Sequence, residues 1–200
     1  MPKIVDKQEM QRRILDAAMG CFLGQGYHAT KMDDVARAAG LAKGTLYLYF
    51  KGKDALMLAL LHRYFGEIRA EVENSPPPTT LAQFLDGLRQ TMPVERLDAT
   101  RLFFDVLGPG FADPRAAEMV GGFVDWLSAQ YAALFRMLAA TGQVRADIDP
   151  EATGRAVAAM LDGLVIHLAL FNISAEEFAQ RRDAAISLLS DGLRGSDGTP

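Results

Sequence analysis

Residues 30–53 constrain the fold of this chain more than any other segment. They read TKMDDVARAAGLAKGTLYLYFKGK. Apolar residues recur at helical spacing from Met32 to Ala39, and Thr30 followed by Asp33 forms a carboxylate variant of the capping box that opens helices. We therefore predict a helix of about two turns that begins after Thr30.

A glycine turn and a second helix follow directly. Gly40 lies where a left-handed backbone is needed to end the first helix. The second helix should begin near Ala42 and run from Lys43 to about Tyr47, with Leu46 as its one strong core residue. The sequence thus predicts two short helices joined by a glycine turn, the second of which has most of its surface free.

The free surface of this second helix has the residue types that contact DNA. A lysine and a hydroxyl near its N-terminal end can reach base edges or phosphates, and a glycine lets the backbone approach closely. The phenols and lysines that follow supply donors and positive charge for flanking phosphates. The alternative is a solvated turn between two ordinary helices. The residues expected to contact DNA are Thr30, Lys43, Gly44, Thr45, Tyr47, Tyr49, Lys51 and Lys53.

Short motifs in the first quarter to third of the chain are shared with a known family. They are Ile14-Leu15-Asp16-Ala17-Ala18, Phe22, Gly26-Tyr27, Thr30, Val35-Ala36, Ala39-Gly40, Gly44-Thr45-Leu46-Tyr47 and Tyr49-Phe50-Lys51, with Lys53 and Leu56. With these motifs the chain resembles the TetR family of bacterial transcriptional regulators. One departure is Ala42, where the family often has Ser or Thr as the N-cap of the recognition helix, because alanine offers no side-chain acceptor.

The distribution of charge agrees with this resemblance. The whole chain has a formal net charge of −4. Residues 1–63 contain ten Lys and Arg against six Asp and Glu, which gives +4, whereas residues 64–200 contain eleven against nineteen, which gives −8. A basic N-terminal part on an acidic body is typical of a DNA-binding head attached to a second domain.

Composition limits the remaining classes of protein. Half of the 200 residues are apolar without a long uninterrupted apolar run, and no secretion signal is evident, so we expect a soluble cytoplasmic protein with no membrane partner. The single cysteine, Cys21, excludes an intrachain disulfide. The three histidines are scattered and no phosphate-binding glycine loop occurs, so we expect no enzyme activity, no metal and no cofactor.

Helical signals run along almost the whole chain and no β alternation persists. We predict an all-α fold of about nine helices, with a three-helix helix-turn-helix head over residues 1–52, a connecting helix from residue 53 and a helical effector-binding and dimerisation domain over 53–194. Residues 195–200 should form a loose tail. The helices should cover residues 7–24, 31–39, 43–47, 53–73, 80–92, 95–107, 114–140, 150–172 and 174–194, with caps at Thr80, Asp113, Asp149 and Ser174.

The helix predicted over residues 150–172 is apolar around much more than half of its circumference. Such a helix must be buried on two sides. Together with the last helix it resembles the two-helix edge by which TetR-like proteins dimerise, and this implies a homodimer that reads a palindromic operator. The alternative is a central helix in a monomer. The interface residues expected from this comparison are Ala156, Gly163, Phe178, Ala185, Leu188, Leu189 and Gly192.

The middle of the chain is rich in large, adaptable apolar side chains. A cavity lined by such residues with a few polar groups would suit a small, largely apolar effector of unknown identity. The alternative is that each of them packs the core or an interface. The candidates for the effector pocket are Phe84, Leu88, Met92, Phe103, Phe104, Phe123, Trp126, Tyr131, Met137, Met160 and His167.

Together these features predict a sequence-specific DNA-binding regulator, in the first place a repressor that a small effector releases from a palindromic operator. The second interpretation is a DNA-binding protein of the same fold whose body recruits a protein partner without a small effector. A helical enzyme that uses the central cavity is the weakest of the three. Sensitivity of DNA binding to a ligand, against co-purification of another protein, separates the first two.

Overall fold

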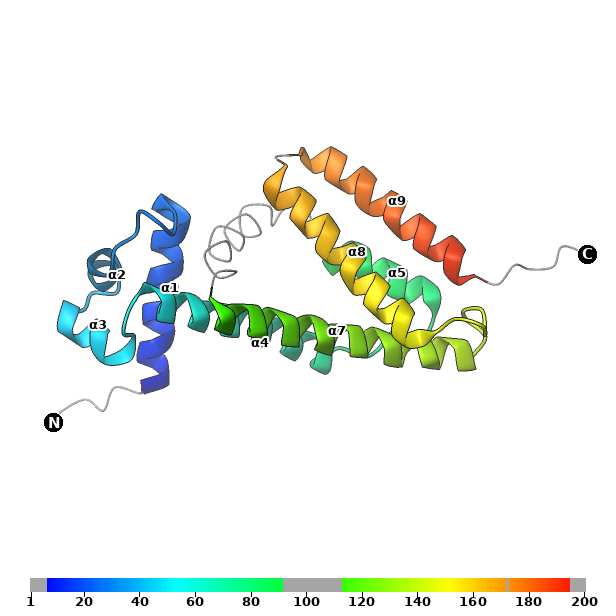
Figure 1. Cartoon of the computed structure of the whole chain (residues 1–200), viewed down its shortest axis with the longest axis horizontal. Helices are drawn as coiled ribbons and strands as arrows, with labels where there is room; N and C mark the ends of the chain where they lie inside the picture. The colour runs from blue at the N-terminus through cyan, green and yellow to red at the C-terminus, as the bar shows by residue number, and fades with distance from the viewer. Residues whose placement is uncertain (1–6, 92–112, 172, 195–200) are drawn as a thin grey trace, which may run out of the picture. The chain divides into compact units, whose positions relative to one another are not determined.

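The computed structural model describes residues 7–91, 113–171 and 173–194, and these residues form helices joined by turns without any strand. This confirms the all-α prediction, with eight helices in the described ranges. The helices are α1 (Lys7–Gln25), α2 (Met32–Ala38), α3 (Lys43–Tyr49), α4 (Lys53–Asn74), α5 (Leu81–Thr91), α7 (Pro114–Ala140), α8 (Pro150–Leu170) and α9 (Ala175–Leu193) (Figure 1). The predicted helix over 95–107 and the pocket candidates Met92, Phe103 and Phe104 lie outside the described residues.

Local capping signals place the helix starts in the C-terminal half. The Asp149 carboxylate accepts from the Ala152 amide at 3.0 Å, with Pro150 at the first helical position of α8. The Ser174 hydroxyl oxygen accepts from the Glu177 amide at 3.1 Å at the start of α9. Equivalent bonds join Arg115 N to Asp113 and Gln83 N to Thr80. All four predicted caps are confirmed, because each depends only on residues two or three positions apart.

The predicted start of α2 was wrong by one residue. Lys31, and not Thr30, takes the extended N-cap backbone, and its amide donates to the Asp34 carboxylate at 3.0 Å. The carboxylate that closes the first turn is therefore Asp34 rather than Asp33. The Thr30 hydroxyl instead donates to the Gly26 carbonyl at 2.8 Å, on the preceding turn.

The chain divides into two compact units, which we describe separately. The described residues of the head unit are 7–72 and 113–120. Its core joins α1 to α4 through buried apolar side chains from every helix: Ile14, Ala18, Phe22, Val35, Ala36, Leu46, Leu56, Met57 and Leu61. The expected boundary at residue 52 falls between α3 and α4, whereas the compact unit continues along α4 to residue 72 because one face of α4 packs into the same core.

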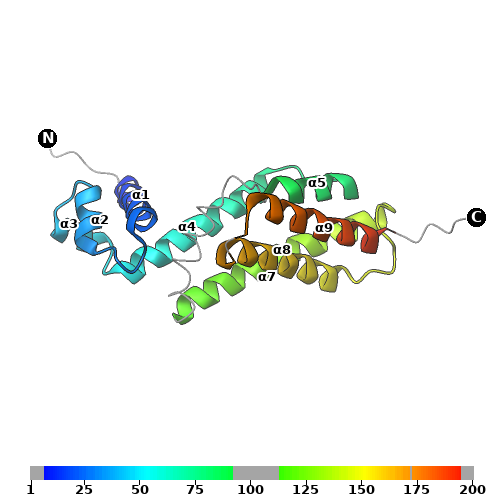
Figure 2. The ribbon, with the colours of Figure 1, turned by 90° about the horizontal axis from the view of Figure 1, so that it is seen from above.

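The described residues of the body unit are 73–91, 121–171 and 173–194. Its main core draws on α5, α7, α8 and α9, and its largest buried side chains are Phe84, Leu85, Leu88, Phe135, Leu138, Val157, Leu161 and Ile186. Helices α8 and α9 lie side by side in both ribbon views (Figures 1 and 2). None of the helices in the described ranges is long and apolar enough to cross a membrane.

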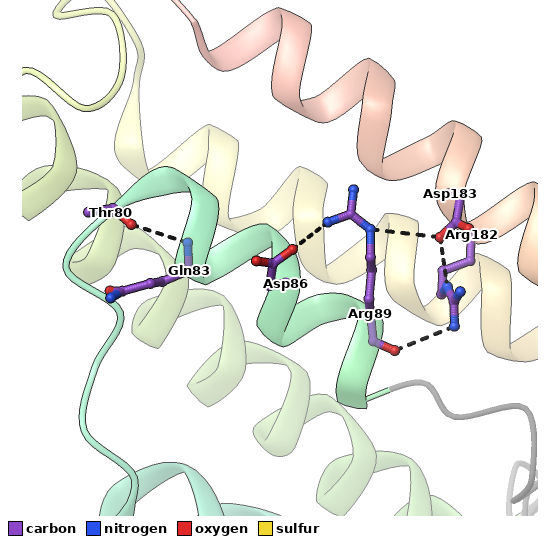
Figure 3. A network of polar contacts seen from close by, with 6 residues as sticks. All are labelled: Thr80, Gln83, Asp86, Arg89, Arg182 and Asp183. Atoms are coloured by element: carbon purple, nitrogen blue, oxygen red, sulfur yellow. Dashed lines mark hydrogen bonds and ion pairs between the residues drawn. The ribbon is translucent and has the colours of Figure 1, made fainter.

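Helix α5 is tied to α9 by a polar network at its C-terminal end. Arg89 pairs with Asp86 at 2.7 Å and lies 3.9 Å from Asp183 on α9, while Arg182 donates to the Arg89 carbonyl at 3.4 Å (Figure 3). A cation near the last carbonyls of a helix is electrostatically favourable. This network therefore orients the end of α5 against α9 within the body unit.

Helices α7 and α8 cross very closely at Gly154. A Cβ atom at this position would lie 2.6 Å from the Ser128 carbonyl oxygen and 2.8 Å from the Ala132 nitrogen. Both contacts are to backbone, so neither could be relieved by a side-chain movement. Among the described glycines of the body unit, Gly154 is the one at which a Cβ would lie within 3.0 Å of backbone atoms, so an alanine there would force the two helices apart.

Candidate nucleic-acid interface

The turn between α2 and α3 sets the direction of α3. Gly40 has a φ of 64°, in the left-handed region that favours glycine, and the Leu41 amide donates back to the Ala36 carbonyl at 2.8 Å. A Cβ on Gly40 would also lie 2.7 Å from Arg13 Nη2 of α1. These contacts confirm the predicted glycine turn and fix the angle at which α3 leaves α2.

Helix α3 presents most of its surface outward. Leu46 is its one buried residue, and Phe50 packs into the core directly after it. Ala42 is the N-cap and makes no side-chain capping bond, as the sequence predicted. Gly44 is exposed, and a Cβ there would meet no atom within 4 Å. The helix is thus held by two side chains and leaves its outer face open to a second molecule.

Lys43 lies at the exposed N-terminal end of α3. Its ammonium group pairs with the Asp33 carboxylate of α2 at 2.7 Å, and this hydrogen bond raises the lysine pKa above its ordinary value. Both side chains are exposed, so water and salt screen the pair strongly. Lys43 therefore stays positively charged and can exchange Asp33 for a phosphate or a base edge.

Thr45, Tyr47 and Tyr49 are half-buried on the flanks of α3, and Lys51 is exposed just beyond its end. The Lys51 ammonium group lies 3.4 Å from the Tyr47 carbonyl, which is a long contact at an exposed site. These four side chains carry hydroxyl and ammonium groups that could meet a phosphate backbone, and their contact with DNA stays a prediction.

Thr30 is the clearest correction among the predicted DNA-contacting residues. Its side chain is only 2% exposed, and its hydroxyl donates to the Gly26 carbonyl while accepting from Gln25 Nε2 at 3.3 Å. A buried hydroxyl with both roles occupied cannot also reach DNA. Thr30 instead joins the end of α1 to the start of α2.

Lys53 has a similar structural role. Its ammonium group donates to the carbonyls of Tyr27, His28 and Thr30 at 2.7, 3.1 and 3.1 Å, and it lies 4.5 Å from the centre of the Tyr27 ring. A lysine has three N–H donors. All three are used on the α1–α2 turn, so we correct the prediction that Lys53 contacts phosphate.

Asp54, the residue after Lys53, also binds the α1–α2 turn, and we call these contacts of Lys53 and Asp54 the clamp. Tyr27 donates from its hydroxyl to the Asp54 carboxylate at 2.9 Å, and burial together with this bond raises the tyrosine pKa well above its ordinary value. Asp16 of α1 also pairs with Arg63 of α4 at 2.6 Å. The start of α4 is thereby bound to the α1–α2 turn, and its middle is paired with α1.

The sequence analysis missed two exposed residues near α3. Leu48 is 78% exposed on α3 itself, and the side chain of Arg37 on α2 is 79% exposed and 3.6 Å from Asp34. The signal for Leu48 was available, because a residue two positions from the buried Leu46 must point away from the core of a helix. The signal for Arg37 was only its type and its position in the last turn of α2.

A shallow depression lies on the head unit beside α1 and α2. It is lined by Cys21, Gly24, Gln25, Asp34, Arg37 and Ala38. Burial and the nearby Asp34 carboxylate raise the pKa of the Cys21 thiol, which disfavours the reactive thiolate. The polar groups here bond to each other, since Gln25 donates to Asp34 at 3.3 Å, so the depression belongs to the α1–α2 junction.

In the body unit, several residues proposed for an effector pocket take part in the core. Phe84 and Leu88 are buried, while Tyr131, Met137 and Met160 pack against the same cluster. The rings of Phe84 and Tyr131 lie 5.8 Å apart. Burial and the charge of Asp162 raise the tyrosine pKa strongly. These contacts favour the interpretation of this group as core.

The remaining pocket candidates lie elsewhere in the body unit. Phe123 is buried and its ring centre is 5.8 Å from that of Trp126, which is partly exposed. His167 is exposed, with its Nδ1 atom 3.2 Å from Arg181 and its ring beside Phe171. His167 is therefore not part of the body core, and its assignment to an effector pocket stays a prediction.

The predicted dimer residues separate into two groups. Phe178 is 1% exposed in a small core with Leu164, Leu168 and Ile173, so it cannot reach a partner and is corrected. Of the others, Ala156, Leu188 and Gly192 are exposed and Gly163 is partly exposed, while Ala185 and Leu189 are partly exposed and also pack against the cores. Leu188 is 75% exposed. Ile166 and Phe171 are further exposed apolar residues that the prediction did not include among the interface residues.

Within the described ranges, no group of His, Cys, Asp or Glu is arranged to hold a metal ion. The side chains with chemical character are lysines, phenols and hydroxyls around α3, and they can bind anions and hydrogen-bond acceptors. The residues around α3 are therefore suited to binding another molecule.

Comparisons with known proteins agree with this geometry over both parts of the chain. The family description "Bacterial regulatory proteins, tetR family" matches residues 14–60, and "BetI-type transcriptional repressor, C-terminal" matches residues 77–194. The repressor KstR of Rhodococcus jostii is 34% identical over 133 residues, which cover 62% of this chain and 60% of the relative. The aligned stretches span 23% to 60% of the lengths of three such curated relatives.

Solved structures show the same fold over nearly the whole chain. A TetR transcription regulator from Haloarcula marismortui has a TM-score of 0.82 and 17% identity, and the match covers 93% of this chain and 98% of the other. A transcriptional regulator from Saccharomonospora viridis, solved in complex with choline, has a TM-score of 0.71 and 22% identity, with 90% and 96% covered.

Proposed function

Because this chain belongs to the TetR family of bacterial regulatory proteins, we propose that it is a homodimeric transcriptional repressor that binds a palindromic operator and is released from it by a small effector. Regulators of this family are DNA-binding transcription factors rather than enzymes. The finer statements, which concern the operator, the dimer and the effector, rest on the arguments that follow.

The observation that carries DNA binding is the outer face of α3. This helix buries only Leu46, and it exposes Lys43 and Gly44 at its N-terminal end, with Thr45 and Tyr47 half-buried beside them. Such a helix contributes little to folding for its length, whereas its lysine, hydroxyls and open backbone suit base edges and phosphates. The charge of +4 over residues 1–63 supports the same role.

The outer faces of α8 and α9 support a homodimer. Ala156, Gly163 and Ile166 recur at helical spacing along the outside of α8, and Leu188 and Gly192 do so along α9. Small residues let a partner helix approach closely, and the large exposed Leu188 would be covered by it. A two-fold pairing of these faces would hold two α3 helices at a fixed separation, which a palindromic operator requires.

Release requires that the effector prefer the body in a form whose heads no longer match the operator. A ligand can shift a conformational equilibrium only by its differential affinity for the two forms. Trp126 is partly exposed beside the buried Phe123, and neither belongs to the main core cluster of the body unit. We propose a small, largely apolar effector in this region, and the choline complex of the Saccharomonospora viridis protein supports a small organic ligand in a body of this fold.

The DNA-binding part is tested by selecting bound sequences from random double-stranded DNA with the full chain. We expect a palindromic sequence whose half-sites are about one helical turn apart. Affinity for this sequence should fall steeply with salt, and Lys51→Ala should reduce the slope by about one unit, as the loss of one phosphate contact does. Glu67→Ala, a change of charge on exposed α4, is the control and should leave the slope unchanged.

Two outcomes would contradict the proposal at different levels. A selection that enriches no sequence would contradict sequence-specific DNA binding. A selected site without two-fold symmetry would contradict binding as a dimer to a palindrome, but not DNA binding itself.

The effector part is tested through the fluorescence of Trp126, which is the only tryptophan in the chain. Choline and its uncharged isostere 3,3-dimethylbutanol are the first probes, since they share shape and differ in charge. An apolar effector site should bind the isostere at least as well as choline and should release operator DNA on binding. A strong preference for choline would show that the site binds a cation rather than an apolar molecule. Release of operator DNA without any change in Trp126 fluorescence would show that the effector binds elsewhere.

A further inference from the structure

Leu48 is the most exposed large apolar residue in the described ranges. It is 78% exposed in the last turn of a helix that otherwise carries polar groups and glycine on its open side. Exposed leucines also occur elsewhere in the head unit, as Leu23 does on α1, so exposure alone assigns no role. What distinguishes Leu48 is its place on the open side of α3.

The geometry of α3 directs Leu48 straight away from the head core. Successive helical residues are rotated by about 100°, so Leu48 lies about 200° around the helix from the buried Leu46. Gly44 is one turn earlier on the same outer face, and a Cβ there would meet no atom within 4 Å. Because Gly44 carries no side chain, the backbone beside Leu48 can approach a surface closely.

The charges around Leu48 decide which kind of surface this is. Lys43 and Lys51 are exposed at the two ends of α3, on a head segment with a formal charge of +4. A polyanion is a better partner for this surface than an apolar protein surface or an uncharged ligand, because neither of these offers negative charge to the two lysines. Within the major groove of DNA, the apolar group displayed on a base edge is the C5 methyl of thymine.

We infer that Leu48 is a specificity-determining residue that contacts the C5 methyl group of a thymine in each half of the operator. This inference rests on the proposed DNA-binding function and adds the base that one side chain reads. Gly44 permits the approach, the lysines hold the phosphates, and Leu48 discriminates thymine from bases without a methyl group at that position.

The test replaces each thymine of the selected operator in turn by deoxyuridine, which pairs in the same way and lacks only the methyl group. For the wild-type chain, one position per half-site should weaken binding about fourfold, the factor that corresponds to about 0.8 kcal/mol for a buried methyl-sized group. Replacement in both half-sites should weaken it about sixteenfold. Leu48→Ala should bind both forms of the operator equally.

Leu23→Ala is the matched control, because Leu23 is a second exposed leucine of the head unit, 54% exposed on α1. This variant should keep the full wild-type discrimination between thymine and deoxyuridine. The inference is overturned if Leu48→Ala discriminates as the wild type does, or if no thymine methyl affects wild-type binding to the selected operator. A chain that selects no sequence at all overturns both this inference and the proposed function, so the two failures are distinguishable.

Discussion

Helices α3 and α8 each combine a buried side with an open one, but they differ in what the open side is made of. Helix α3 opens polar groups, glycine and one leucine to solvent, around a single buried Leu46. Helix α8 buries Val157, Leu161 and Leu164, but it also exposes apolar residues such as Ala156 and Ile166 beside charged ones. In α3 the residue types alone therefore distinguish the buried side from the open side. In α8 apolar residues lie on both sides, so only the packing in the structure shows which of them belong to the core.

The largest expected effect comes from placing a charge on the open side of the body. Leu188→Glu would bring two carboxylates together across a two-fold axis, and like charges in such an interface cost several kcal/mol. We expect the dimer dissociation constant to rise at least about 100-fold, as measured by sedimentation, with a matching loss of operator affinity. Helix content by circular dichroism should be unchanged, since Leu188 is 75% exposed.

Leu23→Glu provides the control for this charge. It introduces the same carboxylate on an exposed leucine of α1 and should leave the protein dimeric. If Leu188→Glu also stays dimeric, the outer faces of α8 and α9 are not the interface. The open side of α8 would then have no assigned function to compare with that of α3.

The next effect concerns the buried side of α8. Gly154→Ala would place a Cβ 2.6 Å from the Ser128 carbonyl oxygen, so α7 and α8 would have to separate. We expect the free energy of unfolding to fall by about 1–3 kcal/mol, as for other overpacked cores, measured by urea denaturation. Gly121→Ala on α7, where a Cβ meets nothing within 4 Å, should instead raise stability by up to about 1 kcal/mol. Equal effects of the two substitutions would show that the crossing has room to relax.

The same contrast explains what could be predicted from sequence. The glycine turn at Gly40 and the caps at Asp149 and Ser174 depend on neighbours a few residues away, and they were predicted correctly. Thr30 and Lys53 were assigned to DNA because their types suit it, but their partners are carbonyls of the α1–α2 turn. For Lys53 these lie 23 to 26 residues away in the chain, and only the folded head brings them together.

The faces of the body helices were harder to predict, though not in every case. Phe178 and Leu188 were assigned to one surface, yet ten residues correspond to about 1000° of rotation, which leaves them about 80° apart on α9. Counting turns would have separated the buried Phe178 from the exposed Leu188. For α8 the count was less useful, since apolar residues surround most of the helix and hydrophobicity does not tell a core from an interface.

The smallest expected effect separates two lysines of the head that the sequence treated alike. Lys53→Met removes three hydrogen bonds from an ammonium group to the carbonyls of the α1–α2 turn. Hydrogen bonds to charged groups contribute more than neutral ones, so we expect a loss of about 1–2 kcal/mol in the free energy of unfolding. Lys51→Met removes an exposed side chain with one long contact and should change stability by less than about 0.5 kcal/mol.

Binding to operator DNA at several salt concentrations then completes the comparison. Lys51→Met should reduce the salt slope by about one unit, while Lys53→Met should leave the slope unchanged under conditions where the protein is folded, because its three donors are already used within the head. A stable Lys53→Met variant with a reduced slope would return Lys53 to the phosphate contacts. In that case the clamp on the α1–α2 turn would be a feature of the free protein that opens on DNA, and the division of α3 and its surroundings into folding and binding residues would have to be redrawn.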